Sequence, residues 1–364
     1  MLVKKIFFIL FQEEINGVLN SQVFDTITFL SSKGNSCKVI FFVNPRYYFK
    51  IRDFLKKKNI EFVLVPSIKS NVRLAQILIK SIFRPNSSDI LIGRGVYAAN
   101  IILVFKNCKT VYDGRGAYYK ELEEYNSITD LDRAIKFEKQ AVELSKYRIA
   151  VSNKLIEYWT ENHWSFNPSR VFTIPTLINT KRLTTDIRVV EDEKIRICFI
   201  GSNGKWQGEN LLINFIKCHL EKRKDLIFNL FMKESSELSV LKNTFPNNIN
   251  ISFVPYQEVK NNIEENDYAL LLRENSITNE VSAPTKFAEY LAAGLKVIIS
   301  EKIGDFSEMV SKNNLGFTYR SGFLKNLKKV TKNEKLEQIE FCHENFTRES
   351  KVNTEKYLQL LKQK

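Results

Sequence analysis

The sequence predicts an α/β protein built from two Rossmann-like parallel-sheet domains. The chain has 364 residues, which exceeds the usual size of a single hydrophobic core. Short β-branched apolar runs alternate with helix-like stretches along its whole length. These runs are continuous rather than alternating, which is typical of strands that are buried on both faces of a parallel sheet. Two successive β-α-β series therefore indicate two parallel-sheet domains.

Seven strands are expected in the first half of the chain and five in the second. The first-half strands are Ile6–Leu10, Cys37–Val43, Phe62–Val65, Ile90–Ile92, Thr110–Tyr112, Arg148–Val151 and Val171–Ile174. The second-half strands are Ile195–Ile200, Leu226–Phe231, Ile249–Val254, Tyr268–Leu272 and Val297–Ser300. Helices are expected at Val18–Ser32, Tyr47–Lys58, Val72–Phe83 and Asn210–Leu220.

The domain boundaries follow from a stretch with weak periodicity and a charged E-D-E-K run. We place a linker there, at 179–194, between a first domain at 1–178 and a second at 195–345. The remaining residues, 346–364, form a final helix from about Thr347 to Gln363. No strand follows this helix, and we expect it to pack back toward the first domain.

Composition indicates a soluble globular protein, with 44% hydrophobic and 26% charged residues. The apolar start M-L-V-K-K-I-F-F-I-L-F is short, lacks a cleavage site and is followed by Gln12, so we expect a first strand rather than a secretory signal. Five scattered cysteines indicate a reducing, cytoplasmic location. Three widely separated histidines make a histidine-based metal site improbable.

The net charge of +14 is concentrated in the first half of the chain. Residues 1–180 carry a charge of +10 and residues 181–364 carry +4, with a basic cluster at 50–58. This bias suggests an anionic partner: a lipid surface, a phosphorylated acceptor or nucleic acid. We find no interleaved basic and aromatic motif, so nucleic acid is not expected.

The segment from 273 to 300 carries the clearest site signal. A strand ends near Arg273, a polar loop follows, and a helix starts near Pro284, which suits the first helical turn. Amides at the amino end of this helix, around Ala283, can bind an anion, and Thr285 and Lys286 add a hydroxyl and a cation.

Glu289 lies one turn beyond Thr285 on the same helix face. A carboxylate beside a diphosphate is repelled unless it has another role, and binding the ribose hydroxyls of the same nucleotide is such a role. Alone, Glu289 is better interpreted as a surface glutamate. With Arg273, Pro284, Thr285 and Lys286 in register, we favour the ligand role.

Two further strand ends supply candidates. The turn G-S-N-G-K-W-Q-G at 201–208 offers Gly201 and Gly204 for close approach to a phosphate and Lys205 as its cation, although many such turns are only tight connections. The turn D-G-R-G offers Asp113 and Arg115, for which a local ion pair is nearly as good an interpretation.

Other polar residues after first-half strands are Asn16, Gly17 and Arg94. Asp130-Leu131-Asp132 spells the D-x-D that metal-dependent sugar transferases use. It lies in a helical stretch, so a solvated helix start is the better interpretation.

At these residues the sequence resembles a known family. The run V-S-A-P-T-K-F-A-E-Y-L-A-A-G-L-K-V-I, within 273–294 and the strand after it, resembles the donor signature of GT-B glycosyltransferases. It is most similar to family four retaining enzymes of bacterial surface-polysaccharide synthesis, such as capsule or O-antigen. The G-S-x-x-K-W-Q-G loop, the Ile303-Gly304-Asp305 turn, the D-x-R-G turn and the V-S-N-K-L segment at Val151 are further matches.

The resemblance implies two domains that face a central cleft, the first for the acceptor and the second for a nucleotide-sugar donor. It implies a diphosphate bound by Lys205, Arg273, Lys286 and the helix amides, with Glu289 on the ribose and no metal or other cofactor. The implied acceptor is a lipid-linked or growing glycan, at the cytoplasmic face of an anionic inner membrane to which the enzyme attaches peripherally. The residues expected to serve catalysis are Lys205, Arg273, Lys286, Asp113 and Glu280.

The sequence departs from the family at three places. Val281 stands eight positions before Glu289, where relatives often have a glutamate, and the adjacent Glu280 is the candidate substitute. Gly93 and Arg94 occupy one region where relatives have a histidine, and Lys296 replaces a proline. Two alternatives to a transferase stay open: a nucleotide-sugar epimerase of the same fold, and a non-catalytic partner that binds nucleotide-sugar.

Overall fold

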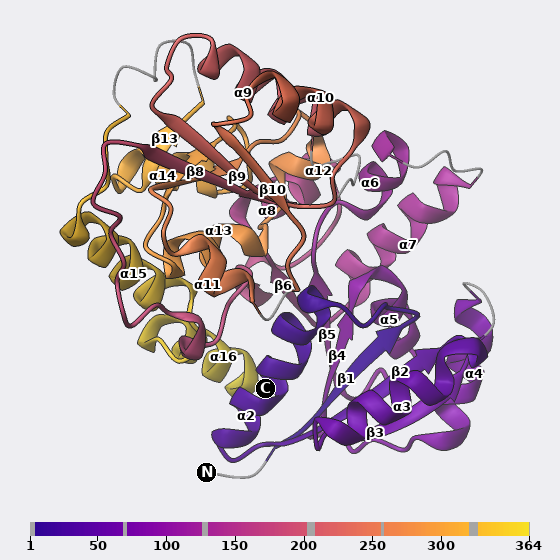
Figure 1. Cartoon of the computed structure of the whole chain (residues 1–364). Coiled ribbons are helices and arrows are strands. Elements are labelled where there is room, and N and C mark those ends of the chain that lie inside the picture. The colour runs from indigo at the N-terminus through magenta and orange to yellow at the C-terminus, as the bar shows by residue number, and fades with distance from the viewer. Residues whose placement is uncertain are drawn as a thin grey trace. The chain divides into compact units, whose positions relative to one another are not determined.

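The computed structural model describes residues 4–67, 71–125, 130–201, 208–255, 258–319 and 327–363 (Figure 1). The chain divides into two compact units, the first formed by 1–177 together with 351–364 and the second by 178–350. Residues 179–194, the expected linker, belong to the second unit, where the amide of Thr184 donates to the carbonyl oxygen of Ala292 at 2.9 Å.

The first unit contains a parallel sheet of seven described strands in the order β3-β2-β1-β4-β5-β6-β7. The strands are β1 (Lys5–Phe11), β2 (Ser36–Val43), β3 (Glu61–Pro66), β4 (Ile90–Arg94), β5 (Lys109–Gly114), β6 (Tyr147–Ala150) and β7 (Val171–Thr173). The order reverses between β1 and β4, and the carboxyl ends of parallel strands beside such a reversal are where open α/β sheets bind ligands.

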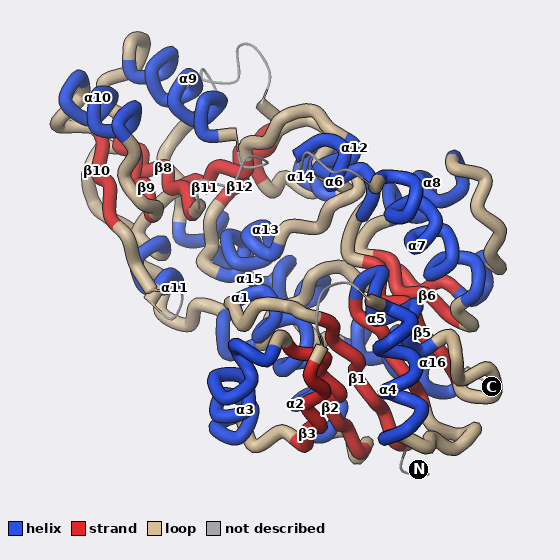
Figure 2. Tube along the Cα trace, turned by 90° about the vertical axis from the view of Figure 1, so that its right-hand side faces the viewer, coloured by secondary structure: helices blue, strands red, loops and turns tan. Residues whose placement is uncertain are grey.

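Helices cover both faces of this sheet (Figure 2). Side chains at alternating positions of β1 enter different clusters: Ile6 packs with residues of α2 and α3, whereas Ile9 packs with residues of α4 and α5. This two-sided burial explains why the strands read as continuous apolar runs. The helices are α1 (Gly17–Leu19), a π-helical turn (Asn20–Phe24), α2 (Asp25–Ser32), α3 (Tyr48–Lys57), α4 (Val72–Ile82), α5 (Gly95–Ile102), α6 (Tyr118–Tyr125), α7 (Leu131–Leu144) and α8 (Asn153–Glu161).

The second unit contains a parallel sheet of six described strands in the order β10-β9-β8-β11-β12-β13. The strands are β8 (Ile195–Ile200), β9 (Leu226–Phe231), β10 (Ile249–Ser252), β11 (Tyr268–Leu271), β12 (Lys296–Ile299) and β13 (Gly316–Thr318). The helices are α9 (Glu209–Leu220), α10 (Ser236–Thr244), α11 (Val259–Ile263), α12 (Ile277–Glu280), α13 (Thr285–Ala292), α14 (Phe306–Lys312) and α15 (Lys332–Phe346). The predicted fold class, α/β with two Rossmann-like parallel-sheet domains, is confirmed.

The chain end returns to the first unit, as predicted. The last helix is α16 (Lys351–Lys362), and the segment 347–350 separates it from α15. Tyr357 of α16 packs against Phe29 of α2 with ring centroids 5.9 Å apart, and Figure 1 shows the yellow α16 beside the indigo α2. Lys109, at the start of β5, donates to the carbonyl oxygen of Gln363 at 2.8 Å.

Candidate functional site

The helix α13 begins beside the carboxyl ends of the central strands of the second sheet. Pro284 is its N-cap residue, with φ −62° and ψ 128°, so it stands just before the first helical turn rather than inside it as predicted. A proline side chain has no acceptor for the amides of that turn. Gly294, with φ +78°, ends the helix in the left-handed conformation that glycine adopts without strain.

The hydroxyl of Tyr290 fixes α13 to the sheet. It accepts a hydrogen bond from the amide of Ile200 at 3.0 Å and donates to the carbonyl oxygen of Leu270 at 3.3 Å. These two residues belong to β8 and β11, so a buried side chain from the helix joins two strand ends. The amide of Gly201, directly after β8, donates to the carbonyl oxygen of Phe231 on β9 at 3.2 Å.

Arg273 is held in a network that sequence reasoning missed. Its amide donates to the hydroxyl oxygen of Ser300 at 2.9 Å, and its Nη1 donates to Oδ1 of Asn279 at 3.0 Å. Asn279 is fully buried and donates from Nδ2 to the carbonyl oxygen of Glu274 at 3.0 Å. The guanidinium is therefore oriented before any ligand binds. In the sequence, Asn279 is only an asparagine six residues after Arg273. The contact between the two side chains becomes visible only in the fold.

Lys286 is partly buried near the amino end of α13. Burial, and then the positive charge of Arg273, lower the pKa of its ammonium to about 7, while the carboxylate of Glu289 acts in the opposite direction. The ammonium lies 5.4 Å from the ring centroid of Phe199 on β8. The structure thus brings Arg273, Lys286 and Glu289 within electrostatic reach of one another, and an incoming anion would relieve the repulsion between the two cations.

A cavity of about 360 Å³ lies at the carboxyl ends of β11 and β12. Arg273, Asn275, Ser300, Lys302 and Tyr319 are among the residues that line it.

Glu289 faces a different and much narrower crevice of about 10 Å³, beside Arg182, Val259 and Ala292. The two charged side chains, Arg273 and Glu289, therefore border separate spaces of the second unit.

The remaining predicted donor residues have varied positions. Ala283 is buried immediately before the N-cap, and Thr285 is the first residue of α13. Glu280 ends α12, next to the asparagine that binds Arg273, while Val281 is buried in the core. Gly204 and Lys205 lie outside the described residues.

In the first unit, three predicted residues lie close together at the carboxyl ends of β4 and β5: Arg94, Asp113 and Arg115. Arg94 and Asp113 are register partners at the ends of β4 and β5. Asp113 Oδ2 lies 2.8 Å from Arg115 Nη2 and 3.8 Å from Arg94 Nη1. The local ion pair between Asp113 and Arg115, weighed in the sequence, is therefore present. Burial opposes the charge of Arg94, yet Glu13 and Asp113 raise its pKa.

Glu13 is a member of this group that the sequence did not single out. Its Oε2 accepts from Arg94 Nε at 2.8 Å. By contrast, Asn16 has a local role, because its Oδ1 caps α1 by accepting from the amide of Leu19 at 2.9 Å, and Gly17 opens that helix.

The D-x-D at 130–132 marks a helix start, as predicted. Asp130 is the N-cap of α7 and accepts from the amide of Arg133 at 3.1 Å. Over the described residues, no group of three or more His, Cys, Asp or Glu side chains is arranged to hold a metal ion. Over the same part of the chain, no helix combines the length and apolarity needed to cross a bilayer.

Two all-parallel Rossmann-like units define the GT-B class of folds. No protein-family model and no curated protein matches the sequence. Solved structures match over nearly the whole chain. TarM gives a TM-score of 0.73 at 10% identity and covers 99% of both chains. HepE from Anabaena, in complex with UDP and glucose, gives 0.67 at 11% identity over 98% of this chain and 99% of its own.

The lipopolysaccharide outer core galactosyltransferase WaaB gives a TM-score of 0.63 at 14% identity, over 98% of this chain and 99% of its own. A putative UDP-N-acetylglucosamine 2-epimerase from Listeria monocytogenes gives a lower score of 0.53 at 10% identity, over 100% of this chain and 91% of its own. At such low identities these likenesses establish the fold.

Proposed function

We propose that the chain is a glycosyltransferase that transfers a sugar from a nucleotide-diphosphate donor to a lipid-linked or growing glycan. The observation that carries the proposal is the pair of cations, Arg273 and Lys286, at the amino end of α13. Two partly desolvated positive charges within mutual reach destabilise each other, and a diphosphate beside a helix amino end compensates both.

The donor role of each residue follows from its position. Arg273, oriented by Asn279, and Lys286 bind the diphosphate, together with amides around Ala283 and Thr285. In this proposal Glu289, one turn further along α13, accepts hydrogen bonds from ribose, so the narrow crevice that it borders has to open when the nucleotide binds. Gly201, Gly204 and Lys205 complete the phosphate site in this proposal. UDP accompanies several of the fold neighbours, among them HepE and a TarM variant from S. aureus, which supports a nucleoside diphosphate as ligand.

The proposed reaction retains the anomeric configuration and uses no metal. The bond between the anomeric carbon and the β-phosphate oxygen breaks, and the electron pair leaves with the nucleoside diphosphate, whose charge Arg273 and Lys286 stabilise. An acceptor hydroxyl bonds to the same face of the sugar, and its proton passes to the departing phosphate oxygen. Asp113 and Glu280 stay candidates for contact with the reacting sugars.

The acceptor side is assigned to the first unit. The residues assigned to it lie at the carboxyl ends of strands or in the loops that follow: Asn16, Gly17, Arg94, Asp113 and Arg115. The basic helix α3 presents Lys56 and Lys57 to solvent, together with Phe49, whose side chain is 66% exposed. We assign this helix to peripheral attachment at an anionic membrane, where a surface-polysaccharide acceptor such as a capsule or O-antigen precursor is held.

The experiment has two stages. Nucleoside diphosphates and nucleotide-sugars are first screened for thermal stabilisation of the full-length chain, because a ligand of the folded state raises its melting temperature. The stabilising nucleotide-sugar is then incubated with and without lipid-linked glycan acceptors, in buffer and in EDTA. Acceptor-dependent release of nucleoside diphosphate that survives EDTA is the expected result.

Other outcomes identify the alternatives. Conversion of the donor to its epimer without acceptor identifies the epimerase, and binding without turnover identifies the non-catalytic partner. Loss of activity in EDTA that manganese restores contradicts the metal-free mechanism.

A further inference from the structure

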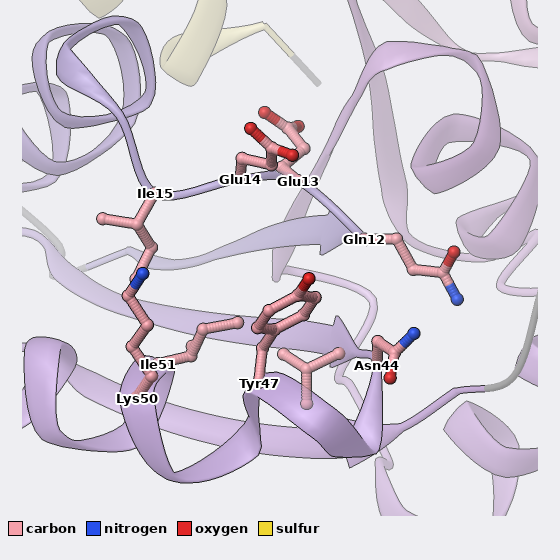
Figure 3. Close-up of a pocket in the computed structure, with 9 residues that line it drawn as sticks. Gln12, Glu13, Glu14, Ile15, Asn44, Tyr47, Lys50 and Ile51 are labelled. Atoms are coloured by element: carbon pink, nitrogen blue, oxygen red, sulfur yellow. The ribbon is translucent and has the colours of Figure 1, made fainter.

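A cavity of about 360 Å³ lies within the first unit, at the carboxyl ends of β1 and β2 (Figure 3). Its size lies within the range of about 300–1,000 Å³ that is usual for small-molecule sites. The polar residues that line it are Gln12, Glu13, Glu14, Asn44, Tyr47 and Lys50. The sequence singled out none of them as a site residue, although Lys50 belongs to the basic cluster at 50–58.

The amide residues of the cavity are held in place. Gln12 adopts a φ of +50°, and its amide donates to the carbonyl oxygen of Phe42 on β2 at 2.8 Å. Its Nε2 donates to the hydroxyl of Ser67, also at 2.8 Å. Asn44 Oδ1 accepts from the amide of Arg46 at 3.0 Å, which caps the turn leading into α3. Both strand ends are therefore fixed, and the cavity exists before any ligand enters.

The carboxylates have different environments. Glu13 is paired with Arg94 at 2.8 Å, so its charge is largely compensated. Glu14 is exposed. Exposed Glu14 and exposed Lys50 bring one negative and one positive charge to the lining, so the cavity is close to neutral and gives a phosphate or carboxylate no net attraction, although the unit as a whole is basic. The local chemistry of the cavity thus differs from the charge balance of its domain.

An aromatic ring stands in the same space. Tyr47 is 49% exposed, and Figure 3 shows its ring rising from the start of α3, with the hydroxyl on the side of Glu13 and Glu14. A flat apolar face beside carboxylate and amide oxygens suits a ligand with an apolar C–H face and many hydroxyl donors. A pyranose sugar has both features.

We propose that this cavity binds an uncharged sugar residue of the acceptor glycan, stacked on Tyr47 and hydrogen-bonded by Glu14, Asn44 and Gln12. The proposal rests on the proposed function and deepens it, because it makes the acceptor unit at this position a neutral sugar. Glu13 connects the cavity to the charged group around Asp113. The ion pair between Glu13 and Arg94 therefore links a sugar bound in the cavity to Arg94 and Asp113, which are assigned to the acceptor side.

The test uses full-length protein and four probes at millimolar concentration. Methyl glucoside and methyl N-acetylglucosaminide are the uncharged probes, and glucuronic acid and glucose 1-phosphate are the anionic probes. Binding is followed by saturation-transfer NMR and titration. The variants are Tyr47→Ala, Glu14→Gln and Glu14→Lys. The control is Glu61→Gln, an exposed glutamate at the amino end of β3, whereas the cavity lies at the carboxyl ends of β1 and β2.

We expect the uncharged probes to bind wild type and the control equally. Tyr47→Ala should weaken them by about two- to tenfold, as expected for the loss of aromatic contact. Glu14→Lys should admit glucuronic acid. The side chains of Glu14 and Tyr47 are exposed or half-exposed, so these variants should keep the melting temperature of the wild type.

Failure of both uncharged probes to bind, or equal binding by Tyr47→Ala and wild type, overturns the proposal. UDP binding and donor turnover are measured on the same samples. Intact donor use with no sugar binding rejects this cavity alone, whereas sugar binding without any use of a nucleotide-sugar rejects the transferase and leaves a sugar-binding cavity.

Discussion

The pKa of the Lys286 ammonium lies close to neutral pH, so a change in its surroundings changes its charge. Burial and Arg273 disfavour the ammonium and bring its pKa to about 7, well below the value of about 10.5 for a free lysine. A bound diphosphate reverses the balance, because two negative phosphates stabilise the protonated form. In the proposed donor site, diphosphate binding is therefore coupled to proton uptake by this side chain.

The first prediction concerns pH. Above pH 7 the free protein holds Lys286 mainly as the neutral amine, so UDP affinity should fall between pH 7 and 9, by up to about tenfold per unit. Isothermal titration at pH 8, in two buffers of different ionisation enthalpy, should detect proton uptake. Lys286→Met should remove both effects. An unchanged proton count in that variant would show that another group titrates.

The second prediction concerns the charge itself. Lys286→Ala should weaken UDP binding by about 10- to 100-fold at pH 7 or below, the usual cost of losing a hydrogen bond to a charged group. Lys312→Ala is the matched control, because Lys312 lies on α14 with its side chain 69% exposed. If the two variants bind UDP equally well, Lys286 has no part in the site.

For single residues, the sequence could predict which side chains lie close together when they are near one another along the chain. Lys286 and Glu289 lie on one helix, and Arg273 follows the strand before it, so their proximity could be inferred from a single strand-loop-helix run. Asn279 and Glu13 could not be inferred in this way. Asn279 acts through the buried contact with Arg273, and Glu13 pairs with Arg94, which lies 81 residues further along the chain.

Elements were predicted more completely than contacts. All twelve expected strands are present, because most are short apolar runs, and central ones such as β5, β11 and β12 are buried along their whole length. The strand β13 was missed. It is short and begins at Gly316, where φ is +145° and an added Cβ would lie 2.0 Å from the carbonyl oxygen of Val297. Its place at the sheet edge comes from pairing with β12, which composition does not reveal.

One pair of elements is joined by an unexpected ion pair. Lys296 of β12, which replaces the proline of the signature that the sequence resembles, is 6% exposed, and its Nζ donates to Oε1 of Glu334 on α15 at 2.8 Å. Burial alone would raise the pKa of Glu334, but hydrogen bonds from Lys296 and Thr331 outweigh it and lower the pKa to about 2. The pair therefore stabilises the docking of α15 on the sheet.

The third prediction is that Lys296→Met lowers the free energy of unfolding by about 1–3 kcal/mol, because Glu334 loses its charged partner. Glu334 has a depressed pKa in the folded state, so this contribution is complete above about pH 4.5 and disappears as the pH falls toward 2. Urea titrations at pH 7 and pH 3 should show the variant's deficit shrinking in acid.

The control for this prediction is Lys312→Met, which breaks the exposed pair with Glu308 and should cost no more than about 0.5 kcal/mol. A deficit in Lys296→Met that is equal at both pH values would assign the loss to packing rather than charge.

For the whole molecule, the charge is the property least explained by the fold. The net charge of +14 is not needed to build two parallel sheets, and most of it lies in the first half of the sequence. The helix α3 buries Ile51 and Leu55 in the core and leaves its basic side chains in solvent. Exposed lysines and an exposed aromatic ring on the same helix are suited to an anionic lipid surface.

The last prediction tests that surface. The full-length chain should sediment with vesicles containing anionic lipid and not with purely zwitterionic ones. Rising salt should release it, because screening shortens the range of the attraction. The double variant Lys56→Gln, Lys57→Gln should weaken attachment by about 1 kcal/mol per lysine removed. The control variant, Lys312→Gln with Lys332→Gln, removes two exposed lysines of the second unit and should attach like wild type. Equal loss in both double variants would mean that net charge alone attracts the protein, and attachment that resists salt would mean that Phe49 and other apolar side chains hold it.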